Sequence, residues 1–283
     1  MMDLALMSLI PQIKTWLDED DIQRNFHYTK SLPTHAVSLE LKIKSPLVLA
    51  GVDYFIATFN SLGIDVEDLL FLRQFEGKSF ASGEVITFKK ALPFAHAVTG
   101  ERLALNLLQH GSSVATYTRA HVELAKKYQI KILDTRKTTP GLRALEKYSV
   151  RVGGGFNHRL GQTDVWMIKD NHKSSLGGLK GALDFFKGQG AFYNNIIAEI
   201  HDLKELDEAI ELGVTHVMLD NFTPAKIEEA VKLKKAGMVY EVSGGLKLST
   251  LQDYFILGVD ALSIGALTHS APRVDLSLKY KAI

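Results

Sequence analysis

The sequence predicts an α/β protein built from two domains, and three observations lead to this prediction. The chain has 283 residues, enough for one large or two ordinary domains, and 46% of them are apolar, which is enough to fill a core. Residues 1–110 mix strand-like and helix-like patterns. Residues 111–269 alternate short apolar runs with helical stretches, which is typical of a parallel sheet whose strands are joined by helices.

The first domain contains two runs in which apolar and polar residues alternate as in half-buried strands, Val37–Ile43 and Ser82–Phe88. Residues Val52–Leu62 between them have the pattern of a helix, so we expect an α+β arrangement. From Thr99 onward, apolar residues recur at spacings of three and four, which predicts amphipathic helices around a boundary near residue 110.

Six short apolar runs are the predicted strands of the second domain. They are Ile130–Leu133, Val165–Ile168, Asn195–Ala198, His216–Leu219, Val239–Val242 and Ala261–Ile264. Helix-forming segments, Leu203–Leu212 and Ile227–Lys235, separate the later runs, and the last four runs recur every 20 to 25 residues. Because no sequence similarity accompanies this period, it indicates a βα barrel and not a solenoid.

Polar or glycine residues follow each predicted strand directly. They are Asp134–Lys137, Lys169–Asn171, Glu199, Asp220–Asn221, Ser243–Gly245 and Gly265. The carboxyl ends of parallel strands meet at one rim of a barrel, and that rim carries the active site in barrel enzymes. Any single strand must end in a polar loop, but six such ends in succession favour a binding site.

Six cationic side chains between residues 102 and 169 are candidates for a shared site. They are Arg102, Arg136, Lys137, His158, Arg159 and Lys169. Like charges repel one another, so their accumulation calls for an anionic ligand. The whole chain has 33 basic and 32 acidic side chains, a net charge of +1, so this attraction is local and neither nucleic acid nor membrane is an expected partner.

Glycine-containing loops offer further places for an anion. The segment Gly153–Arg159 could bring backbone close to a ligand, or it could be an ordinary flexible linker. The segments Ser243–Gly245 and Gly265–Ala266 could hold a phosphate at a helix N-terminus, or they could merely cap helices. Glu199 and Asp220 are the acids of the same rim, where Mg²⁺ or sugar hydroxyls would suit them.

Composition excludes several kinds of chemistry. The chain has no cysteine, which excludes disulfides, thiolate nucleophiles, zinc–thiolate sites and iron–sulfur clusters. The apolar start Met1–Met7 has no basic residue before it, and we expect Pro11 and the acidic run Asp18–Asp21 to end it, so no signal peptide is predicted. No run approaches the ~20 apolar residues of a membrane span. We therefore expect a cytoplasmic protein.

Eight motifs, in order over about residues 95–280, make the chain resemble the quinolinate phosphoribosyltransferases, also called carboxylating nicotinate-nucleotide pyrophosphorylases. They are Glu101–Arg102, Asp134–Gly141, Glu146–Tyr148, Gly153–Arg159, Ile168–His172, Leu219–Asn221, Ser243–Gly245 and Gly265–Ser270. The resemblance implies an N-terminal α/β sandwich over residues 1–110, joined by the C-terminal tail 270–283. It also implies an incomplete parallel βα barrel of six or seven strands over residues 111–269.

The resemblance further implies the activity and the site. A glycosyltransferase of this family moves a phosphoribosyl group from phosphoribosyl pyrophosphate (PRPP) to quinolinate, losing CO2 and forming nicotinate mononucleotide, a precursor of NAD. The implied substrate-binding residues are Arg102, Thr135, Arg136, Lys137, His158, Arg159, Lys169, Glu199, Asp220, Ser243, Gly244, Gly245, Ile264, Gly265 and Ala266. Lys137, Glu199 and Asp220 are the implied catalytic residues. Glu199 and Asp220 would also hold Mg²⁺, directly or through PRPP or water.

A homodimer, or an assembly of dimers, is implied as well, with Arg102 contributed to the neighbouring subunit. The chain departs from the family pattern in three places. Asp20–Phe26 replaces an acidic pair and a Gly-x-Gly-Asp-x-Thr stretch, and we assign no chemistry to it. Ser112–Thr116 has Ser-Val where Gly-Ile is usual, and Ile197–Glu199 retains only the second acid of a Glu-x-Glu motif.

Three other functions stay open from the residues alone. A related phosphoribosyltransferase with another acceptor base is one, although the run Lys169–His172 disfavours it. A Schiff-base aldolase would use Lys169 at a strand end. A phosphosugar-binding protein without activity is the third, but binding alone would not require Lys137, Glu199 and Asp220 together.

Overall fold

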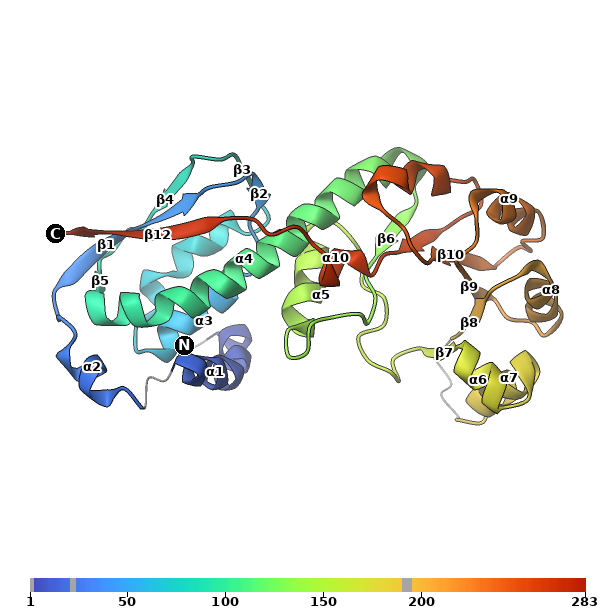
Figure 1. Cartoon of the computed structure of the whole chain (residues 1–283), viewed down its shortest axis with the longest axis horizontal. Helices are drawn as coiled ribbons and strands as arrows, with labels where there is room; N and C mark the ends of the chain where they lie inside the picture. The colour runs from blue at the N-terminus through green and yellow to red at the C-terminus, as the bar shows by residue number, and fades with distance from the viewer. Residues whose placement is uncertain (1–2, 21–23, 190–194) are drawn as a thin grey trace. The chain divides into compact units, whose positions relative to one another are not determined.

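The computed structural model describes residues 3–20, 24–189 and 195–283. Residues 21–23 of the segment Asp20–Phe26 therefore lie outside the described residues, as do 1–2 and 190–194. The chain divides into a first unit, residues 1–117 with 271–283, and a second unit, residues 118–270. The division falls inside helix α4 (Phe94–Ala125), seven residues after the boundary expected at residue 110. Helix α4 continues through this division without a break, so no linker separates the two units (Figure 1).

The first unit is built on an antiparallel sheet. Its strands are β1 (Ala36–Ile43), β4 (Val85–Thr87), β5 (Leu92–Pro93) and β12 (Leu276–Ala282). The C-terminal strand β12 pairs with β1 from Val37 opposite Ala282 to Ile43 opposite Leu276. Every second residue of β1 from Val37 to Ile43 is buried, as the alternation predicted. A smaller two-stranded antiparallel sheet pairs β2 (Leu47–Val48) with β3 (Ser79–Phe80).

Helices pack beside this sheet. They are α1 (Leu4–Leu17), α2 (Phe26–Ser31), α3 (Val52–Ser61), most of α4, and the 3-10 helices η1 (Asp18–Asp20), η2 (Val66–Asp68) and η3 (Leu70–Phe75). The expectation that Pro11 would end the first apolar segment is wrong, because α1 continues through it. A proline removes one backbone hydrogen bond. Burial of Leu6, Ile13 and Leu17 on the same helix compensates for that loss.

The second unit is an open barrel of six parallel strands. They are β6 (Lys131–Leu133), β7 (Trp166–Ile168), β8 (Ile196–Ile200), β9 (His216–Asp220), β10 (Val239–Ser243) and β11 (Ala261–Ser263). Their order is β6-β11-β10-β9-β8-β7, and β6 and β7 do not pair with each other among the described residues. The predicted incomplete barrel is therefore confirmed, with six strands.

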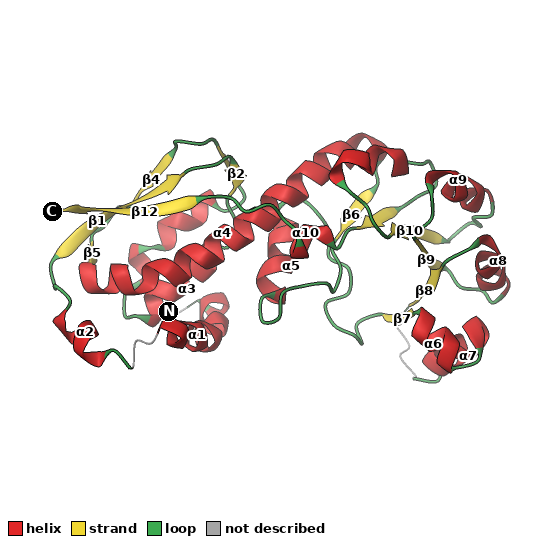
Figure 2. Cartoon of the chain, viewed as in Figure 1, coloured by secondary structure: helices red, strands yellow, loops and turns green. Residues whose placement is uncertain are grey.

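Helices follow the strands of the second unit (Figure 2). They are α5 (Arg143–Val152), α6 (Asp170–Ser175), α7 (Gly178–Lys187), α8 (Leu203–Glu211), α9 (Pro224–Lys232), η5 (Leu248–Tyr254) and α10 (Ala266–His269), while η4 (Lys126–Tyr128) precedes β6. The Asp202 side chain caps α8 by accepting from the Glu205 backbone N–H at 2.8 Å. Thr223 caps α9 in the same way, with Pro224 in its first turn. With these caps α8 begins three residues after the end of β8, and α9 begins four residues after the end of β9, so short loops join these strands to their helices.

The part of the chain that the structure describes contains no helix long and apolar enough to cross a membrane.

Candidate active site

One cavity of about 490 Å³ in the second unit collects side chains from the carboxyl ends of five strands. Its lining residues are Thr135, Arg136, Lys137, His158, Arg159, Met167, Lys169, Glu199, Met218, Asp220 and Ser243. Because all five strands run in parallel, residues more than one hundred positions apart in the chain reach the same rim.

The remaining sequence-predicted residues occupy other places. Ile264 is buried at the end of β11, and Gly265 and Ala266 begin α10. A Cβ at Gly265 would lie 3.0 Å from Lys137 Cδ, so the backbone of α10 closely adjoins a cavity residue. Gly244 and Gly245 form the turn after β10, both with positive φ. Arg102 is exposed on α4 in the first unit and, among the described residues, does not line this cavity.

Gly244 is required by the geometry of that turn. Its φ is +99°, and a Cβ there would lie 2.2 Å from Asn221 Oδ1 and 2.8 Å from the Asn221 backbone nitrogen. Asn221 itself has a φ of 57° and donates from Nδ2 to Asp220 Oδ2 at 2.7 Å. The turn after β10 and the Asp220 side chain are therefore held against each other through Asn221.

The carboxyl groups of the cavity interact with one another through charge. Glu199 is 8% exposed and forms an ion pair with Lys169. Burial first, and the negative charge of Glu199 second, raise the pKa of Asp220, while His201, Lys169 and Lys137 oppose this shift. Carboxylate oxygens are the donors that Mg²⁺ prefers, so the carboxyl groups of Glu199 and Asp220 fit this cation.

Two further residues of this cluster were missed by the sequence analysis. His201 Nε2 lies 2.6 Å from Asp170 Oδ1 and 3.8 Å from Glu199 Oε1, and His201 Nδ1 lies 3.8 Å from Asp220 Oδ2. Ligand atoms of Asp170, Glu199 and His201 all lie within 4.8 Å of one another. The sequence did contain signs of both residues. Asp170 directly follows Lys169. His201 lies two residues after Glu199, and this spacing places two side chains on the same face of a strand.

Backbone oxygens hold the guanidinium of Arg159, one of the cations of the cavity. Arg159 Nη1 donates to the backbone oxygens of Gln162 at 2.9 Å and Val165 at 3.0 Å. Burial first, and the positive charge of Arg136 second, lower the pKa of Arg159. An anionic ligand in the cavity would relieve this repulsion, as the sequence suggested.

A buried ion pair supports one side of the cavity. Asp134, after β6, is fully buried and paired with Lys147 of α5. Asp134 also accepts from Asn157 Nδ2 at 2.6 Å and from the His158 backbone N–H at 2.8 Å. Burial raises the pKa of Asp134, although the hydrogen bond and charge of Lys147 oppose the shift. This network, the Asp134 network, joins β6, α5 and the glycine loop.

The loop Gly153–Arg159 is ordered by backbone pairing, so a flexible linker does not describe it. Phe156 N donates to Ile132 O at 2.8 Å, and Asp134 N donates to Phe156 O at 3.1 Å, which adds a short parallel bridge beside β6. A Cβ at Gly155 would lie 2.8 Å from Thr118 Cγ2 and 2.9 Å from Val150 Cγ1. Glycine therefore lets the loop pack tightly against its neighbours.

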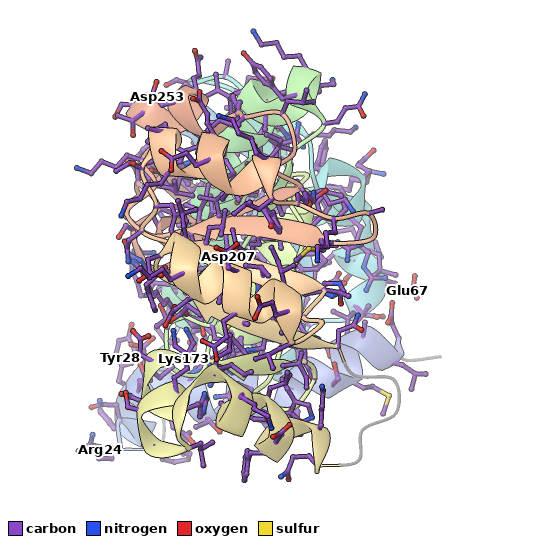
Figure 3. All side chains as sticks on the ribbon, turned by 90° about the vertical axis from the view of Figure 1, so that its right-hand side faces the viewer. Arg24, Tyr28, Glu67, Lys173, Asp207 and Asp253 are labelled. Atoms are coloured by element: carbon purple, nitrogen blue, oxygen red, sulfur yellow. The ribbon has the colours of Figure 1, made fainter. Side chains whose placement is uncertain are left out.

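Lys173 of α6 connects the cluster to the next helix. Its Nζ donates to the backbone oxygen of Glu199 at 3.1 Å and to both carboxylate oxygens of Glu205 at 2.9 Å. Lys173 is one of the side chains labelled in Figure 3. Glu205 also accepts from the His201 backbone N–H at 2.9 Å. The backbone that carries Glu199 and His201 is thereby tied to α6 and α8.

Comparison with known proteins identifies the family. Residues 26–112 match the model of the quinolinate phosphoribosyl transferase N-terminal domain, and residues 114–279 match that of the C-terminal domain. The chain is 41% identical over 239 residues to a probable carboxylating nicotinate-nucleotide pyrophosphorylase of Bacillus subtilis, covering 84% of this chain and 82% of the relative. It is 36% identical over 285 residues to one of Methanocaldococcus jannaschii, covering 98% and 97%.

A solved structure leads to the same family. The crystal structure of NadC from Streptococcus pyogenes superposes with a TM-score of 0.85 at 33% identity, covering 98% of this chain and 99% of that one. Two family models together span nearly the whole described chain, and relatives above 30% identity match it almost end to end. The chain therefore belongs to the quinolinate phosphoribosyltransferase family.

Proposed function

We propose that the cavity of the second unit is the active site for the reaction of this family. The chain is a carboxylating nicotinate-nucleotide pyrophosphorylase, which transfers phosphoribosyl from PRPP to quinolinate and yields nicotinate mononucleotide, pyrophosphate and CO2 in the synthesis of NAD. The observation that supports the placement is the convergence of Arg136, Arg159 and Lys169 with two carboxyl groups on one cavity.

Quinolinate is a pyridine with two adjacent carboxylates, so it needs several cations in one place. In our proposal Arg136, Arg159 and Lys169 bind those carboxylates through charge-assisted hydrogen bonds, with His158 forming part of the wall. The repulsion between the positive charges of Arg136 and Arg159 supports this assignment, because a dianion would offset it.

PRPP would lie on the other side of the same cavity. Ser243, Gly244 and Gly245, together with Ile264, Gly265 and Ala266, would receive its ribose phosphate on backbone N–H groups. Thr135 and Lys137 would face the pyrophosphate, with Lys137 stabilising the negative charge that leaves. Thr268 holds the Lys137 backbone by donating to its carbonyl oxygen at 2.7 Å.

Glu199 and Asp220 would hold Mg²⁺, directly or through PRPP or water. When bound, Mg²⁺ neutralises charge on the departing pyrophosphate. The same two carboxylates would stabilise the positive charge that develops on the sugar carbon as its bond to pyrophosphate breaks.

The pyridine nitrogen then forms the new bond to that sugar carbon and acquires positive charge beside the C2 carboxylate. The bond from C2 to the carboxylate breaks, CO2 departs, and its electron pair stays on C2, where the adjacent cationic nitrogen stabilises it. A proton added to C2 completes nicotinate mononucleotide. The cations around the cavity assist by holding the remaining carboxylate in place.

We further propose a homodimer, or an assembly of dimers, in which Arg102 completes the cavity of the neighbouring subunit. The exposure of Arg102 on α4 supports this, because the side chain is available to another chain. We also propose a cytoplasmic location, which the metabolic role of the family supports.

The deciding experiment mixes the purified protein with quinolinate, PRPP and Mg²⁺ and measures nicotinate mononucleotide and CO2. Nicotinic acid, which lacks the C2 carboxylate, should react at least about a hundredfold more slowly, since the cations built for a second carboxylate stay unpaired. Equal turnover of the two acceptors, or no turnover of quinolinate, would contradict the proposal. Borohydride treatment with a carbonyl substrate should leave Lys169 unmodified, in contrast to a Schiff-base aldolase.

A further inference from the structure

Lys173 of α6 is a buried cation that, within the described part of the chain, does not line the cavity. The residue is 8% exposed. Its hydrogen bonds to the Glu199 carbonyl and to both Glu205 carboxylate oxygens are joined by an ion pair with Asp170 Oδ1 of its own helix at 3.2 Å. A buried ammonium group is costly unless it is paired and hydrogen-bonded, so these contacts hold Lys173 in one place.

The Glu199 carbonyl lies just beyond the paired part of β7 and β8. These strands pair as far as Ile168 opposite Ala198. The next backbone N–H after Ile168, that of Lys169, donates to His172 Nδ1 at 3.0 Å, at the start of α6. Lys173 therefore supplies a donor to the Glu199 carbonyl where β7 has stopped pairing.

Glu205 of α8 holds the next peptide group of β8. Its Oε2 accepts from the His201 backbone N–H at 2.9 Å. The Glu199 carbonyl belongs to the peptide group before Ile200, and the His201 N–H belongs to the one after it. The ion pair of Lys173 and Glu205, here called the β8 clamp, thus fixes two consecutive peptide groups at the end of the strand.

The clamped backbone carries side chains of the carboxylate cluster. Glu199 lines the cavity and pairs with Lys169, and His201 Nδ1 lies 3.8 Å from Asp220 Oδ2. The Glu199 carboxylate moves with the backbone to which it is attached. Because a misplacement of about 1 Å can cost an active site about a hundredfold in rate, the clamp is well placed to control the function of Glu199.

We propose that Lys173, paired with Glu205, is a positioning residue that holds the end of β8 so that Glu199 meets PRPP and its Mg²⁺. The proposal rests on the assignment of Glu199 to the PRPP side of the cavity. It predicts that loss of the clamp weakens PRPP binding and leaves quinolinate binding nearly unchanged, because Arg136 and Arg159 lie on other segments of the chain.

Lys173→Met removes the ammonium group and keeps a side chain of similar length. Lys234→Met is the matched control, because Lys234 Nζ also donates to a backbone oxygen, that of Gly258 at 2.7 Å, and to a carboxylate, Asp260 Oδ2 at 2.5 Å. The Lys234 side chain is 18% exposed and lies outside the described lining of the cavity. Both variants should unfold at lower urea concentrations, since each leaves a carboxylate without its cation.

Only Lys173→Met should raise the dissociation constant of PRPP, measured by calorimetry with Mg²⁺, and we expect a rise of at least about tenfold. The dissociation constant of quinolinate should stay within about threefold of wild type in both variants. General loosening of the fold would instead weaken both substrates.

The double variant Lys173→Met/Glu205→Met separates position from charge. It has the net charge of the wild type and leaves no charge of the ion pair without its partner, so it should fold even if Lys173→Met does not. Because both hydrogen bonds to β8 are lost, PRPP should still bind at least about tenfold more weakly. A smaller loss in the folded double variant, or an equal loss in Lys234→Met, would overturn the proposal.

A second measurement requires no substrate. Hydrogen exchange of the His201 backbone amide, followed by nuclear magnetic resonance, should be at least about tenfold faster in the double variant than in wild type, because its acceptor is gone. Unchanged exchange would also overturn the proposal. If the wild-type protein binds no PRPP, the proposed function fails instead, and the exchange rates still test the β8 clamp.

Discussion

Several charged residues of the cavity lie near groups of the same charge, and this repulsion costs free energy. Arg136 repels Arg159, and Glu199 disfavours ionisation of Asp220. Lys169 partly compensates by pairing with Glu199, although its side chain stays 46% exposed and therefore accessible. Repulsion between like charges of this kind is typical of groups arranged for charged ligands.

Replacement of Lys169 by Ala tests whether the Lys169 side chain binds quinolinate. We expect quinolinate to bind about ten to one hundred times more weakly, because a charge-assisted bond worth about 1.5–3 kcal/mol is lost. Lys180→Ala is the matched control, since the Lys180 side chain is 68% exposed and forms an ion pair with Asp184 of its own helix. The measurement is the dissociation constant of quinolinate, determined by calorimetry for both variants. Unchanged affinity in Lys169→Ala would show that Lys169 does not contact the ligand.

Asp220→Asn should stabilise the protein while removing activity. The pKa of Asp220 is raised in the folded state, so the folded protein holds this proton more tightly than the unfolded chain. Ionised Asp220 therefore costs stability above its raised pKa, and the cost disappears as pH falls toward the ordinary value of 3.8. At neutral pH we expect a gain of about 0.5–2 kcal/mol in the free energy of unfolding.

Thermal melting of wild type and Asp220→Asn across this pH range is the measurement. The difference in Tm should shrink as the solution becomes more acidic. A lower Tm for the variant at neutral pH would contradict the prediction.

At the scale of elements, the Asp134 network holds a strand, a helix and a loop in one arrangement. Asp134 and Lys147 are 0% and 3% exposed, so neither can exchange its partner for water. A substitution that removes only Lys147 leaves a buried carboxyl group without its cation, which is costly to the fold.

Lys147→Met should therefore lower the free energy of unfolding by about 3–5 kcal/mol. In Asp134→Asn/Lys147→Met we expect at least half of that loss to be recovered, because no charge is then buried alone. The chain has two tryptophans, Trp16 and Trp166, so a Trp16→Phe background leaves Trp166 to report urea unfolding of the second unit. Equal urea midpoints for Lys147→Met and Asp134→Asn/Lys147→Met would show that the unpaired carboxyl group of Asp134 is not the cause of the loss.

The turn after β10 offers a second test at this scale. A methyl group at Gly244 would collide with Asn221 at 2.2 Å, whereas Gly237 has a similar positive φ of +82° and nothing within 4 Å. Gly237→Ala should cost only backbone strain of about 1–2 kcal/mol. Gly244→Ala should lose more stability and also weaken PRPP binding at least about tenfold. Equal PRPP affinity in the two variants would show that this turn does not bind PRPP.

At the scale of the whole molecule, the proposed exchange of Arg102 between subunits has a direct consequence. Arg102→Ala and Lys169→Ala should each be nearly inactive, yet unfolding and refolding them together should restore activity. Half of a statistical mixture is heterodimer, in which one site carries both defects and the other carries none, so about a quarter of wild-type activity is expected. Mixed dimers without activity would show that Arg102 serves its own subunit or has no role in the reaction.

Local patterns in the sequence were sufficient for much of this protein. The six strands of the barrel, helix α3 and helices α8 and α9 lie within a few residues of their predicted positions, because periodicity and caps act over short distances. The motifs also identified the family and nearly all the residues that line the cavity.

Only the tertiary structure decided the rest. Helix α1 runs through Pro11 because apolar burial elsewhere outweighs one lost hydrogen bond, and no local pattern predicts that balance. Likewise, His201 lies just after a strand and resembles an ordinary strand residue in the sequence. Its importance comes from Asp170, which the parallel sheet brings near it. Charge and hydrogen bonding depend on distance in space, which the order of residues along a chain does not contain.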